Sequence, residues 1–354
     1  MASTLCQQLG ITVPVIQAPM AGTSTPALAA AVSNAGGLGS IAIGAAAAAE
    51  ADRMIADVRR STDGPFNVNV FCHRAARQNP ALEHAWRARL AGEFKKFNAQ
   101  PPAELREIYN SFVDDHEMLS VLIRHRPAVV SFHFGLPSTV VIGQLKLAGA
   151  ILLATATTLA EAQEAAAGGV DMLVAQGYEA GGHRGVFDPG APDDRLGTLA
   201  LVRILTQKQE LPVIAAGGIM DGAGIAAVLS LGAAGAQLGT AFIACPESSA
   251  DSAFRSALAS NAARHTTMTR VISGRPARCL ANAFTRWGED IADADVPDYP
   301  LAYDAGKALN AAAKSAGEFG YGAHWAGQGA PLSRAMPAAA LIAQLTRELA
   351  VAQE

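Results

Sequence analysis

The sequence is poor in cysteine and in charged residues, and each shortage narrows the possible functions. Its four cysteines are scattered over 354 residues with no CxxC pair, which argues against a disulfide framework and a zinc site. The 27 Lys and Arg residues are interspersed with 31 Asp and Glu residues, so no basic surface for nucleic acid or anionic membranes is indicated. We expect buried core cysteines, a small-molecule partner and a location in the reducing cytoplasm.

Long hydrophobic runs and metal-ligand spacings are also missing. No apolar stretch approaches the roughly 20 residues of a membrane span, and the N-terminal stretch MASTLCQQLG lacks the regions of a secretory signal peptide. No two histidines stand at metal-ligand spacing with a carboxylate, so we expect no metal. Half of the residues are nevertheless hydrophobic. That proportion, at this length, suffices for one large domain with an appendage or for two domains.

Short apolar runs alternate with helix-forming segments along most of the chain. Eight strands are predicted at residues 13–18, 38–43, 66–70, 128–132, 150–154, 170–175, 211–216 and 234–238. Helices are predicted at 25–35, 45–60, 137–147, 158–167, 197–207 and 221–231. Runs that are apolar on both faces and alternate with helices indicate parallel strands. Eight such units predict an α/β fold of the (β/α)8 TIM-barrel type.

A doubly wound open sheet is the rival fold, but its dinucleotide fingerprint is missing. The glycine cluster at residues 36–39 follows a helix and precedes a strand, which is the wrong order for that motif. We therefore predict a barrel domain over residues 1–268 with a helical insertion at about 71–126, in which Pro101 and Pro102 open a helix. Residues 269–325 are predicted to form a smaller lid or substrate domain, and residues 326–354 a terminal segment whose helix packs back on the barrel.

Glycines follow the seventh and eighth predicted strands. Gly217 and Gly218 end the motif AAGGI, and the motif QLGTAF contains Gly239 and Thr240. In TIM barrels, phosphate groups bind at these loops and at the start of a short helix, where bare backbone amides attract an anion. These glycines could merely turn the chain, but their coincidence at both strand ends favours a phosphate site that also includes Gln237 and Leu238.

Polar and apolar groups at other strand ends suit a flat ring. Asn69 and Gln176 place side-chain amides there, each with two donors and an acceptor for the polar edge of an isoalloxazine. Pro19 and Met20 could lay an apolar backbone against the ring. Either amide alone is more simply a strand-end hydrogen-bonding group. Together with the phosphate site they predict FMN as the cofactor, because a mononucleotide needs one phosphate site.

The loop after the sixth strand carries the residues best suited to chemistry. Gly181 and Gly182 can bring the backbone close to a ligand because they carry no Cβ. His183 follows, and imidazole is the side chain best suited to proton transfer near neutral pH. The simpler alternative is a tight loop with a solvated histidine. His133, after the fourth strand, is expected to line the same cavity, and the other six histidines are interpreted as surface or structural.

Several motifs in this sequence resemble those of one enzyme family. PVIQAPMAG, GGLGS, AQGYEAGGHRG, PVIAAGGI and GAQLGTAF look like the class I nitronate monooxygenases, formerly called 2-nitropropane dioxygenases. The C-terminal part is also similar, with Tyr299, Tyr303 and Lys307 at the characteristic spacing. The barrel motifs are shared with flavin-dependent enoyl-acyl carrier protein reductases and some quinone reductases. The Gly-Gly-His loop and the Tyr/Lys set are the narrower markers.

The resemblance implies a specific reaction and roles for specific residues. It implies that FMN is held by Asn69, Gln176, Gly181, Gly218 and residues 237–240, with His183 catalytic near flavin N5. The implied reaction is oxidation of alkyl nitronates, such as propionate 3-nitronate, by O2 to a carbonyl compound and nitrite through a flavosemiquinone. Tyr109, Tyr299, Tyr303 and Lys307 are then expected to bind the anionic substrate, with the last three on one face if that segment is helical.

Two other functions stay open at this point. The first keeps FMN but uses NAD(P)H to reduce a quinone or an enoyl thioester, because a nicotinamide site formed by loops leaves little trace in a sequence. The second is a barrel that binds a phosphate ligand without redox chemistry, which would give a colourless protein. The sequence is compatible with a homodimer and does not identify the physiological nitronate.

Overall fold

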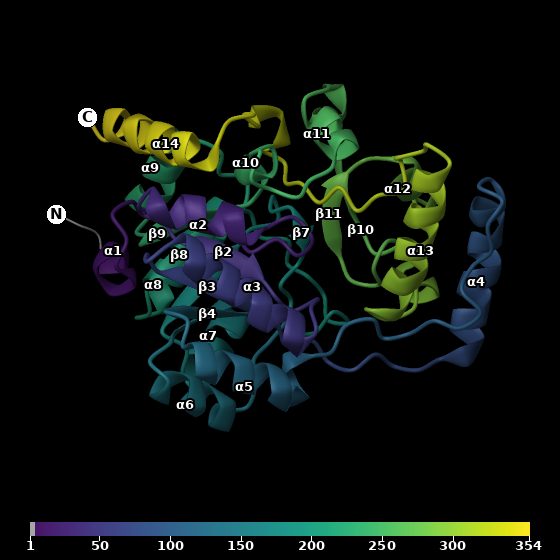
Figure 1. The fold of residues 1–354 in the computed structure, drawn as a ribbon, viewed down its shortest axis with the longest axis horizontal. Helices are drawn as coiled ribbons and strands as arrows, with labels where there is room; N and C mark the ends of the chain where they lie inside the picture. The colour runs from purple at the N-terminus through teal and green to yellow at the C-terminus, as the bar shows by residue number, and fades with distance from the viewer. Residues whose placement is uncertain (1–3) are drawn as a thin grey trace.

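The computed structural model describes residues 4–354 and contains a closed barrel of eight parallel strands (Figure 1). The strands are β1 (Val15–Gln17), β2 (Gly39–Ala42), β3 (Phe66–Phe71), β4 (Val129–His133), β5 (Ile151–Ala156), β6 (Met172–Gln176), β8 (Val213–Ala216) and β9 (Gly235–Leu238). β1 pairs with β9 and bridges to the chain next to β2 through Ile16 and Leu38, which closes the ring. The predicted TIM barrel is confirmed.

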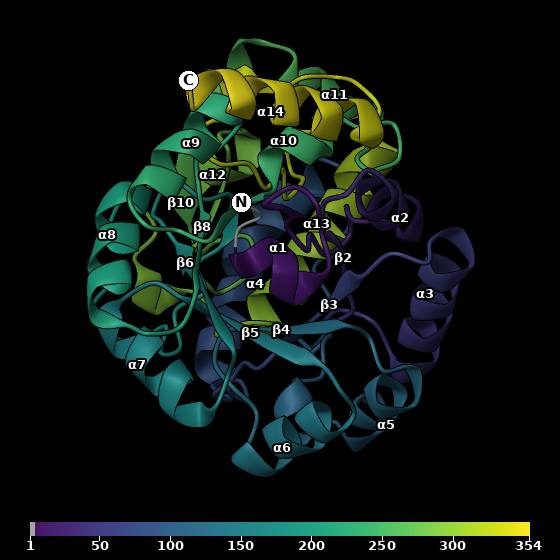
Figure 2. The same cartoon turned by 90° about the vertical axis from the view of Figure 1, so that its left-hand side faces the viewer.

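The helices between the strands form a ring around the barrel (Figure 2). They are α2 (Pro26–Asn34), α3 (Ala48–Ser61), α5 (His116–His125), α6 (Thr139–Leu147), α7 (Leu159–Gly168), α8 (Thr198–Lys208) and α9 (Gly222–Ser230), and the short α10 (Thr240–Ile243) follows the last strand. Side-chain caps begin most of them: Thr25, Thr158 and Asp221 each accept a hydrogen bond from a backbone amide of the first turn. These caps and the buried strands explain why short apolar runs alternate with capped, helix-forming segments in the sequence.

The last helix of the chain completes the ring. α14 (Ala338–Ala352) packs against both α9 and α2, where the eighth outer helix of a TIM barrel belongs. α10 cannot fill that place because it has only four residues. Leu341, Ile342 and Leu345 of α14 join the barrel's main core cluster, so burial of an apolar face holds this helix in place.

A short helix closes the other end of the barrel. α1 (Thr4–Leu9) lies at the centre of the ring in Figure 2. Its Leu5, Cys6 and Leu9 pack with strand residues such as Ile16 and Met172. Helix α1 therefore covers the amino-terminal ends of the strands, and their carboxyl-terminal ends form the open side of the barrel.

A second unit covers the open side. It contains the antiparallel strands β7 (Gly182–His183), β10 (Thr266–Thr269) and β11 (Ala277–Leu280), and the helices α4 (Pro80–Lys95), α11 (Ser252–Leu258), α12 (Ala283–Trp287) and α13 (Leu301–Ser315) (Figure 1). Trp86 and Phe94 of α4 share a separate core cluster with Phe284 and Leu301. Hence α4 packs against the C-terminal elements rather than against the barrel.

The long segment between β3 and β4 therefore serves both units. α4 belongs to the second unit, whereas α5 buries Met118 and Leu122 in the barrel core. The helix expected to open at Pro101 does not form: residues 101–111 are irregular. Arg106 instead donates its backbone amide to Asp304 of α13, so tertiary hydrogen bonds replace helical ones. No helix among residues 4–354 combines the length and apolarity needed to cross a bilayer.

Candidate active site

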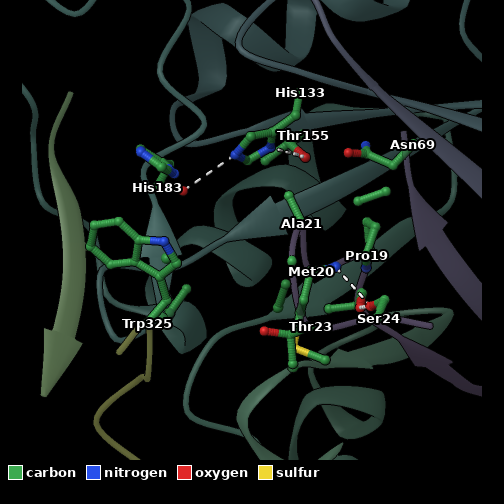
Figure 3. A pocket seen from close by; sticks show the side chains of 18 of the residues that line it. Pro19, Met20, Ala21, Thr23, Ser24, Asn69, His133, Thr155, His183 and Trp325 are labelled. Carbon is green, nitrogen blue, oxygen red and sulfur yellow. Dashed lines mark hydrogen bonds between the residues drawn. The ribbon is translucent and has the colours of Figure 1, made fainter. Parts of the chain in front are cut away.

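A cavity of about 460 Å³ opens at the carboxyl-terminal ends of the barrel strands. Figure 3 shows its side chains: His183, His133 and Asn69 lie along one side, Pro19, Met20 and Ser24 along another, and Trp325 stands beside His183. The cavity also reaches Lys307 of α13. The barrel therefore supplies the floor and the second unit supplies part of the cover.

The structure brings together nearly all the residues proposed from the sequence. The cavity is lined by Pro19, Met20, Asn69, Tyr109, His133, Gln176, Gly181, Gly182, His183, Gly217, Gly218, Gln237, Gly239, Thr240, Tyr299, Tyr303 and Lys307. Leu238 is not among the lining residues. Its side chain is 1% exposed within the barrel core, because alternate residues of a strand face opposite sides. Only its backbone could take part in binding.

The loop after β8 requires glycine at both positions. Gly217 has φ +126° and Gly218 has φ +71°, values that side-chain-bearing residues rarely adopt. A Cβ on Gly217 would also lie 2.7 Å from the hydroxyl oxygen of Thr198. The absence of side chains at this strand end leaves the backbone of both residues open to the cavity.

The loop after β9 adds a helix start to the same end of the cavity. Gly239 is the N-cap of α10, and Thr240 is its first residue. The Thr240 hydroxyl accepts a hydrogen bond of 3.0 Å from the Gly327 amide, so the chain leading to α14 is tied to this loop. A phosphate fits this arrangement of bare amides and one hydroxyl.

The two side-chain amides are held differently. Asn69 donates to the carbonyl and hydroxyl oxygens of Ser131, at 3.1 and 3.0 Å, which leaves its Oδ1 for a ligand. Gln176 donates to the His183 carbonyl at 3.0 Å and accepts from the Gly185 amide at 2.7 Å. Gln176 therefore shapes the loop that carries His183, and retains one amide hydrogen for a ligand.

His183 lies on a strand rather than in the loop expected from the sequence. It is the second residue of β7 and pairs with Ala277 of β11. Its Nε2 lies 2.9 Å from the hydroxyl oxygen of Ser273, a residue that is fully buried. This pairing leaves Nδ1 as the nitrogen available to a ligand. The ring is half-buried in the cavity wall, with Trp325 and Tyr299 beside it at centroid distances of 5.0 and 5.5 Å, which favours a site residue over a freely solvated histidine.

His133 supports His183 rather than offering a free nitrogen. Its Nε2 is 3.3 Å from the His183 carbonyl oxygen and its Nδ1 is 3.1 Å from the Thr155 hydroxyl (Figure 3). A carbonyl oxygen only accepts, so Nε2 carries the proton and Nδ1 accepts from Thr155. Both nitrogens are thus engaged within the protein, although the ring lines the cavity.

Burial keeps both imidazoles neutral at physiological pH. Desolvation, helped by the nearby His133, Arg275 and His73, lowers the pKa of His183 to about 3. Desolvation and Arg275 lower the pKa of His133 to about 4. A neutral imidazole can accept a proton from a bound substrate, whereas an imidazolium cannot.

Three phenols and one ammonium form the outer wall. Tyr299 precedes α13, whereas Tyr303 and Lys307 lie within it. The expectation of one helical face is therefore only partly met, but all three still line the cavity. The Lys307 ammonium lies 5.0 Å from the ring centroid of Tyr109 and 5.4 Å from that of Tyr303, a cation–π arrangement. Burial raises the pKa of Tyr303 to about 12, so its phenol is protonated.

Sequence reasoning missed three residues that shape this site. Ser273 hydrogen-bonds His183, Trp325 packs against it, and Phe134 lies 4.4 Å from the His133 ring. Phe134 directly follows strand β4, so the strand-end rule could have found it. The other two lie in the irregular C-terminal part, where no sequence period marks them.

The described residues offer neither a metal site nor an activated thiol. No group of three or more His, Cys, Asp or Glu residues in the range 4–354 is placed to hold a metal ion. All four cysteines are buried, and burial raises the pKa of Cys245 and Cys279 to about 12. Their interpretation as core residues is confirmed.

Comparison with known proteins agrees with these features. The family model for nitronate monooxygenase matches residues 2–348. A nitronate monooxygenase of Paraburkholderia phytofirmans is 63% identical, over 96% of this chain and 93% of the relative, and one of Pseudomonas aeruginosa is 52% identical over 99% of both. Among solved structures, nitroalkane oxidase from Streptomyces ansochromogenes aligns over 99% of both chains with a TM-score of 0.90 and 40% identity. FabK from Thermotoga maritima aligns over 99% of this chain and 97% of its own, with a TM-score of 0.75 and 28% identity. The chain belongs to the nitronate monooxygenase family.

Proposed function

We propose that this protein is an FMN-dependent enzyme that oxidises alkyl nitronates with O2 to a carbonyl compound and nitrite. The observation that carries the proposal is the position of His183, a half-buried imidazole with a lowered pKa that lines a cavity whose other end carries the bare amides of Gly217, Gly218 and Gly239. Membership of the nitronate monooxygenase family supports the same substrate class. Propionate 3-nitronate and small alkyl nitronates are the proposed substrates.

The residues present fit FMN. Gly217, Gly218, Gly239 and Thr240 would hold the phosphate, and Asn69 would offer its Oδ1 to the ring. When bound, FMN would accept electrons from the substrate and deliver them to O2, a step the protein's own side chains cannot perform.

The protein's residues would orient the substrate and handle its proton. A nitronate is already a carbanion equivalent, so His183 need only position it. With a neutral nitroalkane, Nδ1 of His183 would take the α-proton, while Ser273 holds the opposite nitrogen. Tyr303 and Tyr109 would donate hydrogen bonds to the nitro oxygens, and Lys307 would attract negative charge at the rim. We infer that residues 269–325 act as the substrate-side cover.

Anaerobic mixing tests the function directly. The purified protein should be yellow, and its flavin should bleach when a nitronate is added without O2 but not when NADH is added. Bleaching by NADH and not by nitronate would favour the reductase alternative for quinones or enoyl thioesters. A colourless protein that cannot take up FMN would favour the non-redox phosphate-binding barrel.

Replacing Lys307 by Met should weaken binding of a substrate that carries an extra carboxylate. We expect KM for propionate 3-nitronate to rise by about two- to fivefold, the scale of one exposed charge–charge contact, and KM for ethyl nitronate to change less. Lys314→Met is the matched control, since Lys314 lies on the same helix but pairs with Asp251. Equal changes for both nitronates would remove Lys307 from carboxylate recognition.

A further inference from the structure

Arg275 is a buried cation without an ion-pair partner. It lies between β10 and β11 and is 3% exposed. Its guanidinium donates to the carbonyl of Val186, and its Nε has no hydrogen-bond partner. No carboxylate within residues 4–354 forms a salt bridge with it. Burying a charge in this way is costly unless another interaction compensates for it.

One aromatic ring separates this cation from the active-site cavity. The guanidinium carbon lies 4.2 Å from the centroid of the Phe134 ring, and Phe134 lines the cavity. That ring also contacts His183, at 5.7 Å, and Tyr299, at 5.6 Å. Phe134 has φ +75°, a costly conformation for a bulky residue and one that is concentrated at functional sites.

The cavity itself offers little positive charge to an anion. Among its described lining residues, Lys307 is the only Lys or Arg and Glu50 the only carboxylate. Lys307 lies at the exposed rim, and the two lining histidines are neutral. An anionic nitronate next to His183 would therefore lack a nearby cation from the lining residues alone.

We propose that Arg275 is a positioning residue that supplies a fixed positive charge behind Phe134 and thereby favours binding of an anionic substrate over a neutral one. This inference rests on the proposed function. Through a single ring in a low-dielectric interior, a full charge acts more strongly than it would across water. The bound anion would in turn compensate for the otherwise unpaired guanidinium.

The charged groups around Arg275 are consistent with this role. Burial lowers the pKa of Arg275 to about 10, and the charge of Arg270 also lowers this pKa. Arg275 therefore remains protonated at neutral pH. The charges of Tyr299, Glu161 and Asp188 raise the pKa of Arg275. Both carboxylates have other partners: Glu161 accepts hydrogen bonds from Thr157 and Phe187, and Asp188 pairs with Arg74.

The same charge affects His183. Burial is the largest cause of its lowered pKa, and the charges of His133, Arg275 and His73 contribute in the same direction. Removing the guanidinium should therefore raise the pKa of this imidazole. The charge would thus help the imidazole stay in the form that accepts a proton.

The test compares Arg275→Gln and Arg275→Lys in the flavin-containing protein. For Arg275→Gln we expect KM to rise about tenfold or more for ethyl nitronate, with a much smaller change for nitroethane, its neutral counterpart. Arg275→Lys should keep most of the preference for the anion. Arg278→Gln is the matched control, because Arg278 is equally buried and stacks on Tyr178 at 4.8 Å but does not line the cavity or contact Phe134.

A second readout does not depend on turnover. In a histidine NMR titration, the His183 resonance, assigned from its loss in His183→Asn, should protonate at higher pH in Arg275→Gln than in the parent protein and Arg278→Gln. A purely structural role would lower activity equally with both substrates and leave that titration unchanged, which would overturn the inference. If Arg275→Gln does not fold, loss of the preference for the anion in a folded Arg275→Lys would overturn it. Failure of the parent protein to oxidise any nitronate would instead refute the proposed function.

Discussion

Turnover of neutral nitroalkanes should fall by roughly 10²–10⁴-fold when His183 is replaced by Asn, the usual scale for loss of a general base. Asn cannot accept the α-proton, because its amide nitrogen is not basic. Nitronates need no deprotonation, so their turnover should fall less. The acid limb of the nitroalkane profile should disappear as well, because in the parent protein activity falls when pH drops toward the pKa of the buried imidazole.

The comparison depends on separating chemistry from folding. Steady-state rates with nitroethane and ethyl nitronate should be measured on protein whose flavin content has been checked by absorbance. His84→Asn is a suitable control, since His84 is exposed on α4. Equal loss with both substrates would assign His183 to substrate positioning alone, and unchanged rates would remove it from the mechanism.

The second large effect is expected at the phosphate cradle. Gly239→Asp should weaken FMN binding by about 100-fold or more, since it places a carboxylate where a phosphate dianion would bind. Gly239 has φ −106°, which other residues adopt freely, and a Cβ there would lie 3.4 Å from the Ala18 Cβ. Asp is also a favourable N-cap, so the fold should persist while the cofactor is lost.

Two further variants distinguish charge from size. Gly239→Ala adds volume without charge and should weaken FMN binding less than tenfold. Gly92→Asp adds the same charge on α4, where a Cβ would meet no atom within 4 Å, and should not change binding. The measurement is flavin fluorescence during titration of the flavin-free protein, with thermal unfolding as a check. Full flavin retention in Gly239→Asp would place the phosphate elsewhere.

Local signals in the sequence determined the barrel and most of the candidate site. The eight strands are short apolar runs between capped helices, and both features depend on neighbouring residues alone. Once the barrel is assumed, the last residues of each strand and those just after it must lie at its open end. This rule is sufficient to bring Asn69, Gln176 and Gly218 to one cavity, although they lie far apart in the chain.

Tertiary packing alone decided which residues cover that cavity and surround His183. β7 exists because His183 pairs with β11, a strand about 95 residues later, and no local pattern encodes such a pairing. Ser273, Trp325 and Arg275 come from irregular segments whose positions depend on long-range contacts. For α14, the sequence predicts packing on the barrel, but only the tertiary structure places the helix against α9 and α2. Sequence periodicity specifies which face is buried, whereas the partner for that face is chosen only when the whole chain folds.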